Sequence, residues 1–185
     1  LVEAVNWSPE WKPKSRRRVL SDPRTAHYIA GWPHDTDIGV VAEAASERVG
    51  AAWVRYFPAG DRGYGFVAPD VPELTIGLPR LARPGVGRAL LRAVAESAAD
   101  AGVRRISLSV ERKNFARGLY RSEGYAVVDA SHPQSDTMVK SLAPGRGRRQ
   151  GSPRAQLSGR DGWMAPDAVA GSQFALELAR LPALA

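Results

Sequence analysis

Two glycines one residue apart, Gly85 and Gly87, lie between an apolar run and an amphipathic segment in "LARPGVGRALLRAV" (81–94). Backbone N–H groups at the start of a helix carry partial positive charge, and glycines allow an anion to come close to them. The pattern therefore predicts a phosphate site where this helix begins. Its donors would be the main-chain amides of Gly85, Val86, Gly87, Arg88 and Ala89. Pro84 has no N–H to contribute.

Two common phosphate-binding motifs do not account for this pair. A P-loop requires Gly-Lys followed by Ser or Thr, whereas Gly87 is followed by Arg88 and Ala89. A dinucleotide fingerprint needs a small residue where this sequence has Leu90, although Glu111 stands roughly where its ribose-binding acid would be. The first strand of such a fold should precede the loop near the chain start, and here about 70 residues of other structure come first.

A run downstream of the glycines adds a second pattern. In "SLSVERKNFARGLYRSEGY" (107–125), a strand leads to Asn114, a short helix carries Tyr120, and a Gly-Tyr pair follows. With "VGAAWVRYF", "ELTIGL" and "GVGRALL" in the same order, the sequence resembles the GCN5-related N-acetyltransferase (GNAT) family over residues 1–142. The glycine pair alone is a weak signal, because a tight turn before a helix uses the same residues. The ordered set is specific.

The resemblance implies a mixed α/β fold, with a mostly antiparallel sheet flanked by helices. It also implies acyl-CoA N-acyltransfer, in which an acetyl group passes from the co-substrate acetyl-CoA to a primary amine that attacks the thioester directly. The acceptor would be a small molecule or a peptide N-terminus. A GNAT-like module that binds CoA without turnover is the alternative.

Family members open with a strand, whereas this sequence begins inside the helix-like "LVEAVNW" without a Met. We therefore expect a truncated version of the fold that lacks the first strand. The next strand would then be left as an exposed sheet edge, which favours association with other chains.

Two residues are candidate catalytic groups. By its place in the family pattern, Tyr120 is expected to be the general acid that protonates the departing thiolate. Glu73, at the start of "ELTIGL", is expected to be the base that deprotonates the amine through water, and Asp70 and Glu43 are alternatives. Structural interpretations stay open for both: a buried tyrosine packed in the core, and a solvated carboxylate at a strand end.

Other residues would bind the cofactor. These candidates are Leu78, Arg83, Gly85, Val86, Gly87, Arg88, Ala89, Asn114 and Arg117. The resemblance implies that the N–H of Leu78 polarises the thioester carbonyl and that Asn114 contacts the pantetheine arm, although Asn114 could also cap the following helix. The family motif has Gln or Arg three residues before the first glycine. That position is Ala82 here, in a loop about one residue shorter than usual. Either Arg83 takes the role in the shortened loop, or the affinity for the cofactor is reduced.

Hydrophobic periodicity predicts the elements that must position these residues. Strands are expected at 37–45, 48–57, 73–78, 104–110, 125–130 and 136–142, and helices within 1–32 and at 86–101 and 113–123. Gly77, inside a predicted strand, suggests a bulge or a close backbone approach. The acetyltransferase-like domain would end at residue 142, followed by a flexible linker (143–170) rich in Gly, Pro and Arg. A short helix is expected at 171–185.

Composition excludes several other kinds of site. The sequence has no cysteine, and its three histidines lack metal-ligand spacing, so no metal site is predicted. The net charge of +7 suits a polyanionic cofactor; a nucleic-acid partner is disfavoured, because no recognised binding module accompanies the charge. No apolar run approaches the roughly 20 residues that span a bilayer. We therefore expect a cytoplasmic protein without a membrane partner, and a homodimer stays open.

Overall fold

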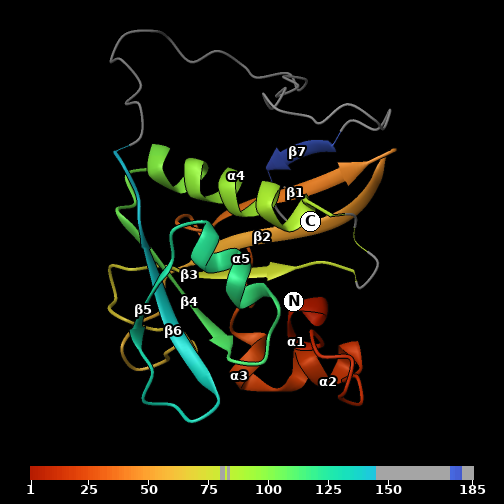
Figure 1. The fold of residues 1–185 in the computed structure, drawn as a ribbon, viewed down its shortest axis with the longest axis horizontal. Helices are drawn as coiled ribbons and strands as arrows, with labels where there is room; N and C mark the ends of the chain where they lie inside the picture. The colour runs from red at the N-terminus through yellow and green to blue at the C-terminus, as the bar shows by residue number, and fades with distance from the viewer. Residues whose placement is uncertain (80–81, 83, 145–175, 181–185) are drawn as a thin grey trace, which may run out of the picture.

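The strands form one mixed sheet in the order β5-β6-β4-β3-β2-β1-β7, seen in the computed structural model of the chain (Figure 1). The structure describes residues 1–79, 82 and 84–144, and the backbone of 176–180. The strands are β1 (Ile38–Ala44), β2 (Glu47–Arg55), β3 (Glu73–Gly77), β4 (Arg105–Glu111), β5 (Ala126–Asp129), β6 (Ser135–Ser141) and β7 (Leu176–Arg180). The helices are α1 (Val2–Val5), α2 (Arg16–Ser21), α3 (Pro23–Ala26), α4 (Val86–Asp100) and α5 (Ala116–Ser122).

Local sequence signals explain where several elements begin and end. The side chain of Ser15 accepts a hydrogen bond from the Arg18 N–H at the start of α2, and α3 begins at a proline, which has a helix-compatible φ and no N–H to leave unpaired. Gly102 follows α4 at φ 89°, a conformation that favours glycine. Between β1 and β2, Ala45 and Ser46 both adopt positive φ, as a tight hairpin requires. The strands and helices predicted within residues 1–142 are thereby confirmed.

The sheet consists of two antiparallel groups joined at one place. β1, β2 and β3 pair antiparallel in register, as do β4, β6 and β5. Between the groups, β3 and β4 run parallel and pair only at Glu73 and Ser107, where the Ser107 N–H also donates to the Pro72 carbonyl at 3.0 Å. The two strands therefore diverge beyond the start of β3.

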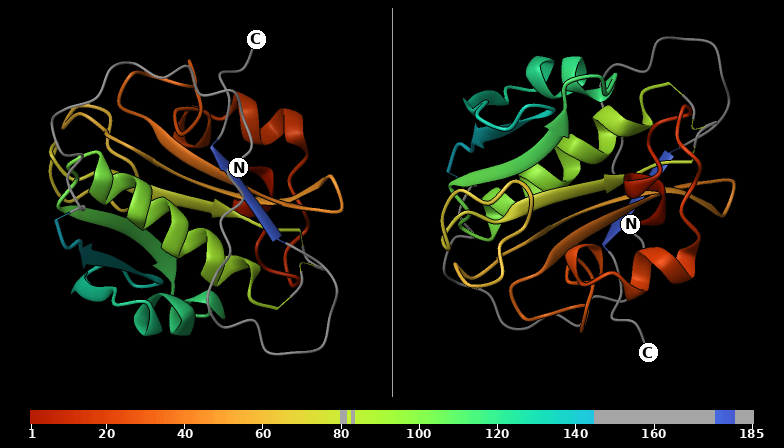
Figure 2. Two further views of the ribbon diagram at one scale, coloured as in Figure 1. Left: turned by 90° about the horizontal axis from the view of Figure 1, so that it is seen from above. Right: turned by 90° about the horizontal axis from the view of Figure 1, so that it is seen from below.

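The hydrophobic core lies between the sheet and α4. Val86, Leu90, Leu91 and Val94 of this helix are each no more than 4% exposed and pack in one cluster with Leu74 of β3. Their spacing places them on one face of α4, as the sequence predicted. Figure 2 shows α4 lying along one face of the sheet and α1–α3 gathered on the other.

The opposite face of β3 is close to the N-terminal helices. Side chains alternate along a strand, so Glu73 and Gly77 point away from the face that carries Leu74. A Cβ on Gly77 would lie 3.5 Å from the backbone nitrogen of Ala4 in α1. This is an ordinary van der Waals distance, and the β2–β3 register is regular up to Gly77, so neither the bulge nor an approach too close for a side chain is observed there.

Two expectations about the sheet edge and the C-terminus are corrected. No strand precedes β1 in residues 1–37, as expected, but the outer edge of β1 is not left open, because β7 pairs with it antiparallel from Val40–Arg180 to Ala44–Leu176. Residues 176–180 are thus a strand and not part of the helix expected at 171–185. The physical reason is that β1 offers unpaired N–H and C=O groups to a segment whose apolar residues alternate, which suits a strand as well as a helix. The predicted linker lies outside the described residues from 145 onward.

Candidate active site

Glu73 begins β3 and its side chain is enclosed. The residue is 3% exposed, and its Oε1 accepts a hydrogen bond from the Tyr28 hydroxyl at 2.7 Å. Oε2 is buried and lacks a hydrogen bond of ordinary geometry. Among the residues that the structure describes, Glu73 has no basic side chain bonded to it, which is unusual for a buried carboxylate.

This environment changes the acidity of Glu73. Burial raises its pKa to about 7, against the smaller opposing effects of the hydrogen bond from Tyr28 and of the nearby Gly65 amide. Burial disfavours the charged carboxylate, and a donor that stabilises the charge recovers only part of that cost. A carboxylate with a pKa near neutrality can accept a proton and release it again at physiological pH, which a general base must do.

Two glycines allow the loop 58–72 to pack directly against the Glu73 carboxylate and the backbone of β4. A Cβ on Gly63 would lie 2.1 Å from Glu73 Oε2, and a Cβ on Gly65 would lie 2.4 Å from the backbone carbon of Leu108. Real Cβ contacts are never this short, so a larger residue at either position would displace its neighbours. The loop therefore closes over Glu73 because these positions lack side chains.

The start of α4 fits an anionic ligand. Gly85 caps this helix at φ 93°, with no side-chain cap, and nothing lies within 4 Å of the position that its Cβ would take. No described residue accepts the backbone N–H groups of Gly85, Val86, Gly87 or Arg88. Amides that no described residue accepts, at the start of a 15-residue helix with open space beside Gly85, can hold a diphosphate.

The start of α4 meets the end of β3 and the helix α5. A Cβ on Gly87 would lie 3.4 Å from Leu119 Cδ2 and 3.6 Å from Leu78 Cδ1. Leu78 directly follows β3, and Leu119 precedes Tyr120 on α5. The amides of α4, the predicted thioester-binding N–H of Leu78 and the helix that carries Tyr120 therefore converge at this end of β3.

Tyr120 is buried on α5 and faces the core. It is 8% exposed, and its ring meets that of Tyr125 edge to face at a centroid distance of 5.8 Å. Burial raises the pKa of Tyr120 to about 12, so its hydroxyl keeps its proton at neutral pH. The side chain is thus packed in the core, and its predicted role as a proton donor stays a prediction.

An ion cluster holds α5 against α4. Glu123, at the end of α5, pairs with Arg88 and, at 3.0 Å, with Arg92. The Glu123 side chain is 6% exposed. Burial raises its pKa, but the hydrogen bonds and charges of Arg92 and Arg88 outweigh this effect and the net pKa is lowered. The Arg88 side chain is therefore engaged with Glu123, and the part of Arg88 that remains a candidate for the phosphate site is its backbone N–H.

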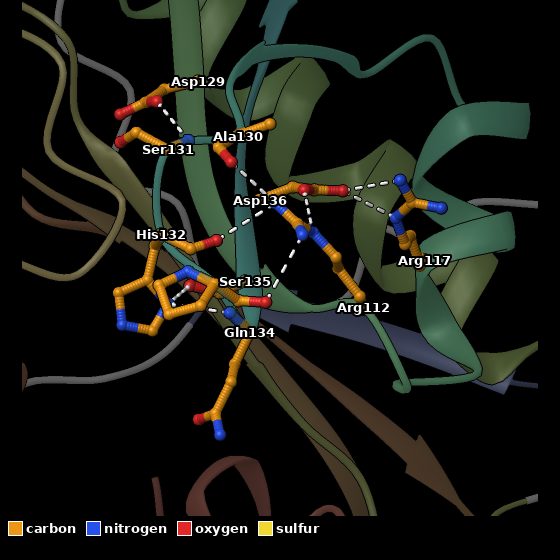
Figure 3. Close-up of polar contacts among 10 residues, drawn as sticks. Arg112, Arg117, Asp129, Ala130, Ser131, His132, Gln134, Ser135 and Asp136 are labelled. Carbon is orange, nitrogen blue, oxygen red and sulfur yellow. Dashed lines mark hydrogen bonds and ion pairs between the residues drawn. The ribbon is translucent and has the colours of Figure 1, made fainter.

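Two predicted cofactor ligands at the start of α5 have structural partners. The Asn114 side chain accepts a hydrogen bond from the Ala116 N–H at 2.8 Å, as a helix cap does. Arg117 Nε donates to Asp136 at 2.8 Å, and Arg112 donates to the same carboxylate (Figure 3). Asp136 is nearly fully buried, and these two arginines hold its pKa below the usual range. The Arg117 charge is therefore already balanced within the protein.

The sequence matches the family described as "Acetyltransferase (GNAT) family" over residues 3–125, more than half of the chain. The chain belongs to this GNAT family. The family resemblance and the mixed, mostly antiparallel α/β fold predicted from the sequence are therefore confirmed. No curated protein matches the sequence.

Several solved structures resemble this GNAT protein. A GCN5-related N-acetyltransferase from Kribbella flavida is 22% identical, with a TM-score of 0.53, 71% of this chain covered and 80% of that one. The GNAT domain of S. lividans PAT is 21% identical, with a TM-score of 0.51 and coverages of 59% and 64%. These likenesses concern the fold.

The PaiA N-acetyltransferase from Thermoplasma acidophilum, solved in complex with coenzyme A, is 21% identical, with a TM-score of 0.46 and coverages of 57% and 61%. This chain therefore spans less than two thirds of the length of the PaiA and PAT structures.

The structure separates the residues that the sequence singled out. Glu73 lies at the start of β3, and the α4 amides with Leu78 lie beyond its other end. Of the alternative bases, Asp70 is 77% exposed and paired with an arginine, and Glu43 also faces an arginine, on β2. Arg83 lies outside the described residues. The roles of the catalytic and cofactor-binding candidates therefore stay predictions.

Sequence reasoning missed Tyr28 as part of this GNAT site. It lies just after α3, 45 residues before the carboxylate that it contacts. The residues around it in the sequence indicate only the end of a helix. No pattern of residue spacing links such a tyrosine to a strand that follows three loops later. Tyr64, in the loop 58–72, is 61% exposed, and its ring stacks on that of Tyr28 at a centroid distance of 6.3 Å.

The described part of the chain has neither a cluster of metal ligands nor a membrane-spanning helix. No group of three or more histidine, cysteine or acidic side chains is arranged to hold a metal ion there. None of its helices is long and apolar enough to cross a membrane.

Proposed function

We propose that this GNAT protein is an acetyl-CoA-dependent N-acetyltransferase in which a primary amine attacks the thioester directly. The observation that carries this proposal is the arrangement at the two ends of β3. At one end lies a buried carboxylate whose pKa is about 7. At the other end, unpaired helix amides and the N–H of Leu78 converge where β3 has left β4.

The α4 amides and Leu78 would hold the co-substrate. The amides of Gly85, Val86, Gly87 and Arg88 have no acceptor among the described residues and would bind the diphosphate. The bound co-substrate supplies an acetyl group activated as a thioester. The N–H of Leu78 would donate to the carbonyl oxygen of the thioester as negative charge develops on it. Donors held in place in this way are usually the largest single contribution to transition-state stabilisation.

Glu73 would remove the proton from the acceptor. Because its pKa is about 7, a large share of the carboxylate is ionised at neutral pH and can take a proton from the ammonium, directly or through water. The neutral amine then forms the new C–N bond as the C–S bond breaks. The enclosed position of Glu73 means that the loop carrying Gly63 must shift to admit the acceptor or a water molecule.

Tyr120 would return a proton to the leaving group. Its pKa of about 12 keeps the hydroxyl protonated, and a thiolate, whose pKa is several units lower, leaves more readily when a donor lies next to it. We expect Tyr120→Phe to lower kcat about 10- to 100-fold while the Kd for CoA changes less than about threefold. An equal loss of CoA binding would show that Tyr120 acts through packing alone.

A CoA-binding module without turnover is the second candidate. The 3% exposure of Glu73 favours it, because a base that no acceptor reaches would do no chemistry. Thiol release from acetyl-CoA, followed across a panel of primary amines and peptide N-termini, decides between the two. Turnover with any amine supports the enzyme. Thermal stabilisation by CoA without thiol release from any member would support the binding module.

A further inference from the structure

While Glu73 is ionised, the hydrogen bonds around Tyr28 have only one possible direction. The Tyr64 N–H donates to the Tyr28 hydroxyl oxygen at 2.6 Å, and that oxygen is 2.7 Å from Glu73 Oε1. A backbone N–H can only donate, and a phenol has a single hydrogen. The Tyr28 hydroxyl therefore donates its hydrogen to Oε1, and a chain of hydrogen bonds runs from the Tyr64 N–H through Tyr28 to Glu73.

Tyr28 is held firmly in this position. It is 6% exposed, and its carbonyl oxygen accepts the indole N–H of Trp53 at 3.0 Å. Its ring packs edge to face against Phe57 at 5.0 Å. Burial and the negative charge of Glu73 raise the pKa of Tyr28, so the phenol does not ionise and remains a donor at any pH at which the protein works.

The two carboxylate oxygens of Glu73 are consequently different. Oε1 already accepts the Tyr28 hydrogen, which stabilises negative charge on it and makes it the weaker base of the two oxygens. Oε2 has no hydrogen bond of ordinary geometry, and it lies against the position of Gly63. Oε2 is therefore the more basic oxygen, and it lies under the loop 58–72, which must shift before a substrate or a water molecule can reach it.

We propose that Tyr28 is a positioning residue for Glu73: it occupies Oε1 and so makes Oε2 the atom that takes the proton from the acceptor amine. This rests on the proposed function, in which Glu73 is the base. Tyr28 touches neither substrate; it fixes the rotamer of the carboxylate and sets which oxygen is basic.

Other charged groups near Glu73 are already paired. Arg55 lies opposite Glu73 in the β2–β3 pairing, but its guanidinium bonds to Asp37 at 3.0 Å and to backbone carbonyls of the α3 region. His27, beside Tyr28, pairs with Asp61 at 2.8 Å. The β4 neighbour, Ser107, is uncharged. Within the described chain, Tyr28 is the one side chain hydrogen-bonded to Glu73, so changing it tests a single contact.

The experiment is a ¹³C carboxyl NMR titration of Glu73, in the full chain without substrates, with its resonance identified by its loss in E73Q. Tyr28→Phe removes the donor and is expected to raise the Glu73 pKa by about one unit, because a hydrogen bond to the charged form favours ionisation. Site-specific 3-fluorotyrosine at position 28, a stronger donor of nearly equal size, is expected to lower it. Phe57→Leu alters the packing of Tyr28 without removing a hydrogen bond and should leave the Glu73 pKa unchanged.

The kinetic counterpart is the acid limb of kcat/KM against pH, measured with the best amine of the panel. We expect the limb to move with the Glu73 pKa, upward by about one unit in Tyr28→Phe and downward with 3-fluorotyrosine. An unchanged Glu73 resonance in both variants would overturn the role of Tyr28. A moved resonance with an unmoved kinetic limb would instead overturn the assignment of Glu73 as the base, so the two failures are distinguishable. Should Tyr28→Phe not fold, the fluorinated protein alone decides.

Discussion

Glu73 and Glu123 are both glutamates with almost no exposed surface, and the protein treats them in opposite ways. Glu73 receives one neutral hydrogen bond, and burial raises its pKa to about 7. Glu123 is also buried, but Arg88 and Arg92 more than offset this and its pKa is lowered. The difference shows that the partners of a buried carboxylate, and not burial itself, decide whether it can exchange a proton.

The two environments also have opposite consequences for stability. A group whose pKa is raised on folding stabilises the protein below its unfolded pKa, and this stabilisation is lost as the pH rises through the folded value. A group whose pKa is lowered stabilises above its unfolded pKa and loses this effect on acidification. Glu73 thus costs stability at neutral pH, whereas Glu123 contributes it. This is what we expect of a carboxylate kept for chemistry and of one kept for structure.

The largest expected effect concerns catalysis. Glu73→Gln keeps the shape of the side chain and removes the base, so kcat/KM is expected to fall about 10²- to 10⁴-fold at neutral pH. The matched change Glu123→Gln should lower it less than about tenfold, since Glu123 acts only by holding α5 on α4. The measurement is thiol release under identical conditions. Equal losses of kcat/KM in the two variants would show that Glu73 and Glu123 do not differ in their role in catalysis.

The next effect is on stability and has opposite signs in the same two variants. The wild-type protein should lose about 3 kcal/mol between pH 4.5 and 7 from Glu73, given its pKa of about 7 against an ordinary 4.5. Glu73→Gln should therefore have a Tm about 4–8 °C above wild type at pH 8, with the difference disappearing near pH 5. Glu123→Gln should have a Tm about 2–4 °C below wild type at pH 8.

Calorimetry from pH 4 to 8 checks both curves. The Tm deficit of Glu123→Gln should begin to shrink below pH 4.5, the ordinary glutamate pKa, and should disappear as the pH falls through the lowered pKa of the folded wild-type carboxylate. If both variants shifted the Tm in the same direction at pH 8, the contrast in pKa would not describe the folded protein.

The smallest effect sharpens the Glu73 side of the comparison. A Cβ on Gly63 would lie 2.1 Å from Oε2, so Gly63→Ala should destabilise the protein by about 1–3 kcal/mol. In a Glu73→Ala background part of that cost should vanish, because the nearest obstructing oxygen is gone while the Tyr28 hydroxyl, 2.8 Å from the same position, remains. Gly60 in the same loop has nothing within 4 Å of its Cβ position, so Gly60→Ala should change stability by no more than about 0.5 kcal/mol. Chemical unfolding of the four variants measures the coupling.

The fold was predictable from the sequence where local rules decide it. The apolar spacing of α4, the Gly102 that follows it and the alternating strands are properties of short segments, and a few residues suffice to recognise them. The glycine pair at 85 and 87 belongs to this class only as a mark of the helix start, since a tight turn before a helix uses the same residues whether or not a phosphate binds there.

The Glu73 site was predictable only in part, because its character depends on contacts between distant segments. The position of the carboxylate at the start of β3 was visible, but the sequence suggested a solvated charge as readily as a base. Its enclosure comes from a loop glycine ten residues away and from Tyr28, 45 residues away. Likewise, nothing near Arg117 in the sequence indicates that Asp136 engages its charge. The strand at 176–180 depends on a partner, β1, more than 130 residues earlier.

The single pairing between β3 and β4 places a strand edge in the middle of a sheet instead of at its rim. An unpaired rim strand readily recruits a strand from another polypeptide, which leads to aggregation. Here the bare main chain of β3 is flanked by β4, by α4 on one face and by α1 on the other. A second protein could form a strand pair with it only if the domain opened. The molecule thus keeps the open main chain of β3 inside the domain, and β5 and β7 form the rim of the sheet in its place.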